Sequence, residues 1–354
     1  YIVSFKKHTR IDFEANVQAV KNQFIGRSES NQVLHKFDSV LNGISAKLDR
    51  TTLERVKALS SVERVEEDGI VQVSAVQDNA SWGLARVSQR PKLGPSPYTY
   101  KYDDNAGEGV NIYILDTGIN IDHEDFKGRI TWGITTAYRS QGDNDYHGHG
   151  THCAGSAAGT IYGVAKKAKI IAVKVLGDKG GGFSSDIIAG VNWVVKNKSG
   201  VKGNVISMRL AGGLNESLNT AVNDAVDQGV ISIIAAGNYN KDACEYSPGS
   251  AKKAITVGSI DVNDTKAGNS NHGPCVGIHA PGVKILSTYI GNSTATKVLS
   301  GTSMATPHVA GLAATLLSQG IHANELETKL KSLGTPDIIQ GLPEKTVNLL
   351  AYSG

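Results

Sequence analysis

The sequence predicts an α/β protein with two domains. A small α+β domain covers residues 1–74, and a larger domain over residues 75–354 contains a parallel β-sheet with helices on both faces. The length of 354 residues suits two domains of about 100–200 residues each. Only three of the 40 glycines and none of the nine prolines precede residue 75, so tight turns concentrate in the rest of the chain. From residue 110 onward, short apolar runs alternate with amphipathic segments, which is typical of α/β folds.

The composition excludes several classes of protein. The 36 Lys and Arg residues outnumber the 33 Asp and Glu residues by only three, which gives no electrostatic footprint for nucleic acid or an anionic membrane. Hydrophobic residues make up 40% and charged residues 19%, so the chain can bury a core and is neither disordered nor fibrous. No apolar run approaches the roughly 18 residues of a membrane helix. We therefore expect neither a nucleic-acid partner nor a membrane anchor.

The small domain reads as alternating strands and helices. Apolar or alternating patterns predict strands over residues 1–5, 33–40, 44–48 and 70–76. Apolar side chains at helical spacing predict a helix over residues 13–24, and a capping box of Thr51 and Glu54 predicts the start of a second helix. This β-α-β-β-α-β order is that of the ferredoxin-like fold. The pattern alone is equally compatible with a small binding or dimerisation domain.

The large domain is predicted from near-continuous apolar runs, which suit strands buried on both faces. These runs cover residues 110–115, 169–175, 204–208 and 229–235, with amphipathic segments over residues 184–196 and 218–227. Ligands of such sheets bind at the carboxyl ends of the strands. Polar residues at strand ends are therefore the first candidates for a functional site.

The cysteines do not form a disulfide scaffold. There are three, Cys153, Cys244 and Cys275, and no C-x-x-C pair indicates zinc or redox chemistry. Their number allows one disulfide with one thiol left over. Five Asn-x-Ser/Thr sequons are compatible with a secretory route and with glycosylation; they begin at Asn79, Asn197, Asn215, Asn263 and Asn292.

Three polar groups are candidate site residues, and each has an ordinary structural interpretation when taken alone. Asp116 follows an apolar run as a strand-end aspartate would. His149 and His152 could share a helix face as metal ligands, but no third ligand or HExxH-type base accompanies them. Ser303 follows a glycine-rich turn at the start of a helix, where serine is commonly an N-cap worth about 1 kcal/mol.

The order Asp, His, Ser along the chain is that of the subtilisin catalytic triad. The blocks ILDTGI (114–119), HGHGTHCAG (147–155) and SGTSMATPHVAG (300–311) resemble the three active-site blocks of subtilisin-like serine proteases. The resemblance is greatest to the proteinase K branch and its fungal secreted and vacuolar, cerevisin-type members. It covers nearly the whole chain, because residues 75–86 resemble the mature start, residues 346–352 the tail and residues 1–74 the inhibitory prodomain.

The resemblance implies a subtilisin-like catalytic domain that acts as a serine endopeptidase on proteins or peptides. Ser303 would be the nucleophile, His149 its general base and Asp116 the group that orients His149 and stabilises its cationic form. Asn238 and the backbone N–H of Ser303 would form the oxyanion hole. The substrate would bind as an added β-strand.

The resemblance also gives the substrate groove, and here the chain departs from the family pattern. Gly180, Gly181 and Gly182 would form one rail, and residues 208–213 the other, with Ala235 and Gly237 next to the oxyanion hole. Where the family reads Ser-Leu-Gly-Gly, this chain has Arg209, Leu210, Ala211 and Gly212. Residues 269–273 also differ, with Asn269 in place of a usual Phe.

These departures keep two other classes of function open. Arg209 is expected either to point into the groove, where its charge would oppose the cationic His149, or to turn outward to solvent or to a carboxylate, where this penalty would be smaller. The altered groove favours, as the alternative, a triad-bearing scaffold with impaired or repurposed activity. A structural or carrier role is disfavoured because the triad and Asn238 are all present.

The resemblance has further implications for metals, cysteines and processing. No cofactor is expected to be required and no metal ligands are assigned. Gly277 replaces an Asp that helps to bind calcium in relatives, so that calcium site should be weak or absent. Cys244 would pair with Cys275 and leave Cys153 buried and free. The chain would cleave itself near Ser74–Ala75, and the 1–74 piece would remain an inhibitor.

The expected location is extracellular, with the vacuole as the alternative, and the expected assembly is a monomer. The chain begins at Tyr1, so any export signal is expected to have been removed or left out of the numbering.

Overall fold

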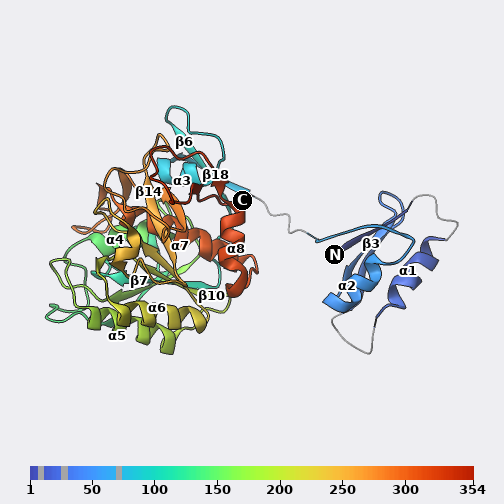
Figure 1. Ribbon diagram of the computed structural model, residues 1–354, viewed down its shortest axis with the longest axis horizontal. Helices are drawn as coiled ribbons and strands as arrows, with labels where there is room; N and C mark the ends of the chain where they lie inside the picture. The colour runs from blue at the N-terminus through green and yellow to red at the C-terminus, as the bar shows by residue number, and fades with distance from the viewer. Residues whose placement is uncertain (7–11, 25–30, 69–73) are drawn as a thin grey trace. The chain divides into compact units, whose positions relative to one another are not determined.

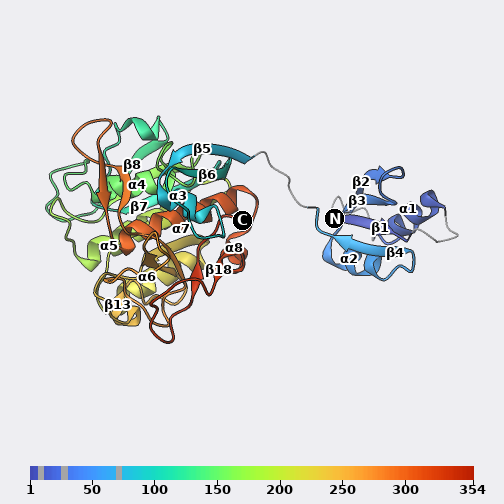
Figure 2. The same ribbon diagram turned by 90° about the horizontal axis from the view of Figure 1, so that it is seen from above.

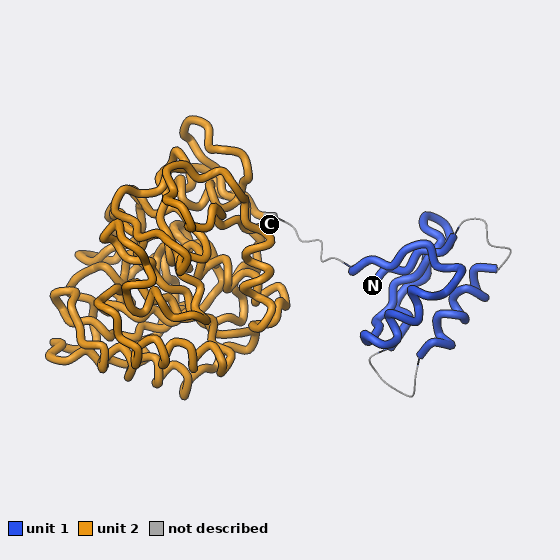
Figure 3. Tube along the Cα trace, in the orientation of Figure 1, with its two compact units in different colours: residues 1–72 blue, residues 73–354 orange. Residues whose placement is uncertain are grey.

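The protein forms two compact units, Tyr1–Gln72 and Val73–Gly354 (Figure 3). The structure, a computed structural model, describes residues 1–6, 12–24, 31–68 and 74–354. The boundary between the units lies two residues before the domain boundary predicted from the sequence.

The first unit is a four-stranded antiparallel sheet with two helices. Its elements are β1 (Ile2–Phe5), α1 (Phe13–Lys21), β2 (Gln32–Phe37), β3 (Gly43–Lys47), α2 (Arg50–Lys57) and β4 (Val62–Glu66). The strand order is β2-β3-β1-β4. The chain order and this sheet order are those of the ferredoxin-like fold. Val3, Phe5, Val17, Ile44 and Val56 form the centre of its core.

Two details of this unit differ from the sequence prediction. The N-cap of α2 is Asp49, whose carboxylate accepts the backbone N–H of Thr52 at 2.7 Å, so the helix begins before the predicted capping box. The fourth strand of the sheet is β4 over Val62–Glu66, where no strand was predicted, and the described end of the strand predicted over residues 70–76 belongs to the second unit. Residues 69–73 lie outside the described part, and Ser74 begins strand β5 (Ser74–Ala80) of the second unit, which pairs with β6 (Tyr98–Asp103). Alternation shows that a segment is a strand but not which sheet it joins.

The second unit contains a nine-stranded sheet in the order β18-β19-β15-β14-β12-β10-β7-β9-β8. The neighbours from β15 to β8 are all parallel, whereas β18 and β19 pair antiparallel at one edge. The predicted apolar runs become four adjacent strands of this sheet, and five further strands complete it. The strands are β7 (Val110–Asp116), β8 (Ile130–Thr135), β9 (Lys169–Lys174), β10 (Gly203–Met208), β12 (Val230–Ala235), β14 (Ile255–Ile260), β15 (Ile278–Pro281), β18 (Thr335–Pro336) and β19 (Leu349–Leu350).

Helices cover both faces of this sheet. The longer ones are α4 (His149–Ala158), α5 (Ser184–Asn197), α6 (Glu216–Asp227), α7 (Thr302–Ser318) and α8 (Ala323–Leu333), and α3 (Trp82–Val87) is shorter. Helices α5 and α6 lie side by side in both views (Figure 1 and Figure 2) and cover one face, while α4 and α7 pack on the other. No helix in the described ranges combines the length and apolarity needed to cross a bilayer.

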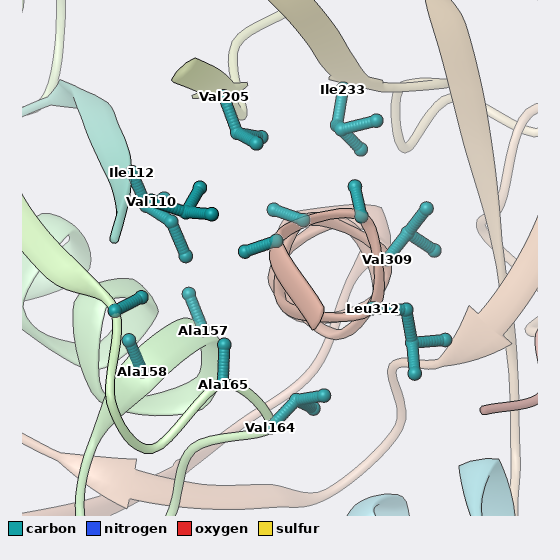
Figure 4. Close-up of a cluster of buried hydrophobic side chains, with 14 of the residues drawn as sticks. Val110, Ile112, Ala157, Ala158, Val164, Ala165, Val205, Ile233, Val309 and Leu312 are labelled. Atoms are coloured by element: carbon teal, nitrogen blue, oxygen red, sulfur yellow. The ribbon is translucent and has the colours of Figure 1, made fainter. Parts of the chain in front are cut away.

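Successive residues of each strand face opposite helix layers, because strand side chains alternate. On β7, Ile112 and Ile114 belong to the core that contains α4 and α7, whereas Tyr113 and Leu115 belong to the core under α5 and α6. Figure 4 shows this first core, with Val309 and Leu312 on α7 and Ile112, Val205 and Ile233 on the strands around it. The alternation then directs the next even-numbered residue of β7, Asp116, toward α4.

Candidate active site

The predicted triad residues come from the carboxyl end of a central strand and from the N-termini of the two helices on one face. Asp116 is the last residue of β7, His149 begins α4, and Ser303 is the second residue of α7. The Nδ1 atom of His149 lies 2.8 Å from Oδ1 and 3.0 Å from Oδ2 of Asp116. Asp116 is fully buried and His149 is about one-fifth exposed at its side chain, 21%. The base is therefore held by a buried carboxylate and still reaches the surface.

Glycine and a buried aspartate hold α4 against the end of β7. A Cβ at Gly150 would lie 2.0 Å from the carbonyl oxygen of Gly118, so only glycine permits this approach. Asp145 is buried and accepts the hydroxyl of Thr117 at 2.8 Å and the backbone N–H of Gly148 at 2.8 Å through Oδ1. Its Oδ2 accepts the hydroxyl and backbone N–H of Thr151. Asp145 thus ties the strand of Asp116 to the helix of His149, a role that the sequence analysis missed.

The hydroxyl of Ser303 donates to the backbone carbonyl of Arg209 at 3.3 Å. Within the described residues, no hydrogen bond joins Ser303 Oγ to His149. Catalytic hydrogen bonds in the absence of substrate are commonly long or misaligned and tighten in the complex. The Ser303 hydroxyl must leave the Arg209 carbonyl before it can donate to His149.

Asn238, the predicted oxyanion donor, contacts the N-terminus of α7. It follows β12 and its Oδ1 accepts the backbone N–H of Thr302 at 2.8 Å and the Thr302 hydroxyl at 3.1 Å. Because Oδ1 is occupied at the N-terminus of α7, the exposed amide nitrogen of Asn238 is the group left to donate. Asn238 contacts Thr302, the residue before Ser303, whose backbone N–H is the second donor predicted from the sequence.

The loop that carries Asn238 is held by Asn271, another residue whose role the sequence analysis missed. Asn271 is fully buried; its amide donates to Ala236 O at 2.9 Å, and its Oδ1 accepts the N–H groups of Tyr239 and Lys241 at 2.9 and 3.1 Å. A Cβ at Gly237, where φ is +102°, would lie 2.5 Å from the Asn271 amide. Only the place of Asn271 in the chain could have pointed to this role, because Asn271 belongs to the 269–273 segment that departs from the family pattern.

The predicted cysteine pairing is confirmed. Cys244 and Cys275 form a disulfide with their Cα atoms 5.3 Å apart, and Cys153 is buried and free. The bridge joins the two segments that meet beside the oxyanion-hole loop, where the Ala243 N–H donates to His272 O at 2.8 Å.

A cavity of about 400 Å³ lies between the two predicted rails. It is lined by Gly180, Gly181 and Gly182 on one side, by Leu210, Ala211, Gly212 and Gly213 on the other, and by His147 and His149. Ala235 and Gly237 are buried and do not line it. Gly237 instead faces Ala211, because a Cβ built on Gly237 would lie 3.3 Å from the Ala211 methyl group.

The expectation that Arg209 points into the groove is wrong, and the alternative holds in part, because the side chain turns toward a carboxylate but toward that of buried Asp116 and not outward. The side chain enters neither the open groove nor solvent; it is fully buried below the site, with Nη1 3.9 Å from Asp116 Oδ2 and Nη2 donating to Ser207 Oγ at 3.1 Å. Its Nε and Nη1 atoms are buried without a hydrogen-bond partner in the described part of the chain. Burial lowers the pKa of Arg209 to about 9, partly offset by Asp116, so the guanidinium is charged at neutral pH.

Asp116 is correspondingly held as a carboxylate. Burial alone would raise its pKa, but the charge and hydrogen bond of His149 and the charge of Arg209 outweigh burial and lower the pKa below its ordinary value. Asp116 therefore has two basic neighbours, His149, which is hydrogen-bonded to it, and Arg209, which is not.

His152 does not share a metal site with His149. Its Nε2 lies 3.0 Å from the carbonyl oxygens of Ile285 and Lys297, and burial lowers its pKa to about 4. Among the described residues, only one group of three metal-ligating side chains converges, and it consists of Asp116, His149 and Cys153. Two of these, Asp116 and His149, are the hydrogen-bonded pair described above.

Comparison with known proteins agrees with this geometry. The model of the Subtilase family matches residues 107–339, and that of Peptidase inhibitor I9 matches residues 1–74. The subtilisin-like proteinase Spm1 of Pyricularia oryzae is 41% identical over 410 residues, which cover 100% of this chain and 76% of Spm1. Cerevisin of Saccharomyces cerevisiae is 40% identical over 403 residues, covering 100% of this chain and 63% of cerevisin.

A comparison with solved structures also finds similarity to a subtilisin-like protease. The crystal structure of a cold adapted subtilisin-like serine proteinase superposes with a TM-score of 0.73 at 41% identity, covering 78% of this chain and 99% of that chain. The chain spans about two-thirds to three-quarters of the length of the two curated relatives described above. It belongs to the subtilase family of serine proteases and carries an I9 inhibitor segment before the peptidase domain.

Proposed function

We propose that this chain is a serine endopeptidase that cleaves proteins or peptides through Asp116, His149 and Ser303. The hydrogen bond of 2.8 Å between His149 and buried Asp116, with Ser303 at the start of the adjacent α7, carries the proposal. An oriented imidazole next to a serine hydroxyl is the arrangement that activates a weak nucleophile.

The reaction would proceed in two steps. Ser303 Oγ attacks the scissile carbonyl carbon while its proton moves to His149 Nε2, and the negative oxygen is held by Asn238 Nδ2 and the Ser303 N–H. Collapse of this intermediate breaks the C–N bond, and His149 returns the proton to the leaving amine. Water then attacks the acyl-enzyme with His149 again as base, which releases the carboxylic acid product and restores Ser303.

The first unit would act as an inhibitor and folding partner that the enzyme removes by cleavage near Ser74–Ala75. The I9 match over residues 1–74 and the unit boundary after Gln72 support this cleavage site. Any calcium site near Gly277 would be weak, since that residue has no carboxylate and a Cβ there would lie 3.7 Å from Lys331 Nζ. We further propose that no cofactor is required and that the enzyme is monomeric and secreted, with the vacuole as the alternative location.

The test compares the wild type with Ser303→Ala by intact mass and by hydrolysis of casein. We expect wild-type protein to separate near residue 74 and to hydrolyse casein, and the variant to do neither. Equal cleavage of both proteins at that bond would show that another protease removes the first unit.

A second candidate function is a triad-bearing scaffold with impaired or repurposed activity. The observation that favours it is the buried guanidinium of Arg209 beside Asp116, with two nitrogens that lack partners. Wild-type protein that reacts with a fluorophosphonate at Ser303 but does not hydrolyse casein would support this candidate over the first.

A further inference from the structure

The cavity between the rails has an unequal charge. His147 and His149 line it, and the guanidinium of Arg209 lies below it. No aspartate or glutamate is among its lining residues in the described part of the chain. A cleft lined by one sign of charge favours ligands of the opposite sign.

His147 is the one of these three groups that is free to meet a substrate side chain. Its ring centroid lies 6.2 Å from that of His149, and a Cβ at Gly180 would lie 2.9 Å from His147 Nε2. The imidazole therefore lies between the base and the first residue of the glycine rail. The side chain is exposed, and no hydrogen bond involves its ring nitrogens within the described residues.

The backbone of His147, unlike its ring, is fixed. Its N–H donates to Asp145 Oδ1 at 3.0 Å, and its carbonyl accepts the hydroxyl of Tyr289 at 2.9 Å. The backbone thus fixes where the side chain begins beside the groove, while the polar atoms of the ring remain available.

The charged groups around His147 leave a positive balance. Asp145 is saturated with hydrogen bonds, Asp178 pairs with Lys174 at 3.0 Å, and His149 is bonded to Asp116. The cations are not compensated in the same way: Lys297 lies 3.2 Å from the Tyr289 hydroxyl, and Lys179 precedes Gly180. The titratable and charged groups near His147 are Asp145, which accepts its N–H, His149, Lys297 on the other side of Tyr289, Arg209 along the same cavity, and Asp178 and Lys179, which precede the glycine rail in the sequence.

We propose that His147 is a specificity-determining residue that selects peptides with an acidic side chain within two residues of the scissile bond. An extended substrate advances about 3.3 Å per residue, so the 6.2 Å between the two rings corresponds to about two residues. Histidine changes its charge between pH 5 and 8, so the preference strengthens as the pH falls. This inference rests on the proposed endopeptidase activity and names a substrate class for the same site.

The experiment uses mature enzyme and peptide pairs that differ only by Glu or Gln at one position, scanned across the four residues before and two after the scissile bond. We expect one position within two residues of the bond at which kcat/KM for Glu exceeds that for Gln about fivefold at pH 5.5, the upper end for an exposed ion pair. The ratio should fall to near one at pH 8, and 0.5 M salt should reduce it at pH 5.5.

Two variants test the assignment to His147. His147→Asn should abolish the Glu/Gln difference at pH 5.5, whereas Lys179→Gln, which removes a nearby exposed cation, should retain most of it. A ratio of one in the wild type at both pH values, or an unchanged ratio in His147→Asn, would overturn the inference while leaving the endopeptidase proposal intact.

Failure of the proposed function has a different signature. Wild-type enzyme that cleaves none of the peptides contradicts the endopeptidase proposal. In that case the same pairs are titrated by calorimetry into the Ser303→Ala protein. Tighter binding of Glu peptides at pH 5.5 that depends on His147 would still support the inference, and equal binding of Glu and Gln peptides would overturn it.

Discussion

Two segments contact the carboxylate of Asp116, the start of α4 and the end of β10, and they differ in how their polar groups are satisfied. At the start of α4, His149 is hydrogen-bonded to Asp116 at 2.8 Å, and Asp145 accepts five hydrogen bonds that fix the segment. At the end of β10, the guanidinium of Arg209 remains 3.9 Å from the same carboxylate, with Nε and Nη1 unpartnered. The start of α4 therefore stabilises the contact between His149 and Asp116. The end of β10 instead adds a buried charge beside this contact, and that charge opposes it.

This difference predicts opposite responses to substitution. Removing an acceptor that several buried donors share leaves those donors without partners, which is costly. Removing a desolvated cation that makes one hydrogen bond relieves a burial cost and has a small or favourable effect on stability. Four measurements test the contrast between the two segments.

Acid should cause the largest loss of stability, through protonation of buried histidines that include two on α4 and α7. Burial lowers the pKa of His152 on α4, His308 on α7 and His279 on β15 to about 4. The unfolded chain binds these protons near pH 6.5, so stability is complete above pH 6.5 and falls as the pH drops toward 4. Each histidine can contribute about 3 kcal/mol to this loss. Urea unfolding of mature protein at pH 7.5, 5.5 and 4.5 measures it.

His279→Phe supplies the control for the acid measurement. Neither ring nitrogen of His279 makes a hydrogen bond of good geometry among the described residues, and the Leu349 backbone raises its pKa less than burial lowers it, so an apolar ring loses little there. The variant should lose less stability than the wild type between pH 7.5 and 4.5, by up to about 3 kcal/mol. Identical pH profiles for the two proteins would show that the buried histidines do not cause the acid loss.

Substitution of Asp145 should give the largest loss from a single residue at neutral pH. Asp145→Ala leaves the N–H groups of His147, Gly148 and Thr151 without an acceptor, and should reduce the free energy of unfolding by on the order of 4 kcal/mol. Asp143→Ala, on the same loop but exposed, is the matched control and should change it by less than about 0.5 kcal/mol. Equal effects of the two substitutions would contradict the bracing role of Asp145.

Arg209→Met should have the opposite sign. Loss of the buried cation should leave stability unchanged or raise it by about 1 kcal/mol. Two unit charges about 6 Å apart repel by roughly 2–3 kcal/mol at an effective dielectric of about 20, so turnover should rise about tenfold to a hundredfold as His149 becomes cationic in the transition state. Arg209→Lys, which retains the charge, should gain much less. A fall in turnover in Arg209→Met would show that the guanidinium supports the site.

The orientation of Arg209 illustrates what sequence reasoning captured and what it missed. The triad blocks identified Asp116, His149 and Ser303, because each residue stands at a strand end or helix start that glycines and apolar runs define. The side-chain direction of Arg209 required the sheet register. Met208 pairs with Leu115 in the parallel ladder, so Arg209 is the next residue along and faces the same side as Asp116. The alternation along residues 204–208 predicts that successive side chains face opposite sides of the sheet. The pairing with β7 was needed to show that Arg209 faces the same side as Asp116.

The residues missed altogether act through tertiary contacts. Asn271 holds the oxyanion-hole loop from a position 33 residues beyond Asn238, and no local pattern links the two. The N-cap of α2 was misplaced for a related reason, since both Asp49 and Thr51 are good caps and their local geometry decides between them. Sheet membership of residues 74–76 likewise depends on their partner β6.

The smallest expected effect is on the cleavage of peptides and concerns Ala211, which lies beside the groove after the end of β10. The Ala211 methyl group faces Gly237, and the Tyr239 hydroxyl donates to the Ala211 carbonyl at 3.3 Å, which narrows the space beside the oxyanion hole. The scissile carbonyl belongs to the residue before the cut, so the side chain of that residue must enter this space. Ala211→Gly removes one methyl group, worth about 0.8 kcal/mol, and should raise kcat/KM several-fold for peptides with a large residue there.

This gain should appear in KM and not in the rate of Ser303 labelling by a small fluorophosphonate, because the charges around Asp116 are unchanged. Gly212→Ala adds a methyl group at a position with no neighbour within 4 Å, so it controls for the loss of backbone flexibility without narrowing the same space. If Ala211→Gly raises the rate of Ser303 labelling as much as Arg209→Met does, the two substitutions act through the same feature at the end of β10. The electrostatic effect of Arg209 and the steric effect of Ala211 would then not be separable. If Ala211→Gly instead changes only the preference for large over small residues, the buried charge limits turnover and the methyl group limits substrate size.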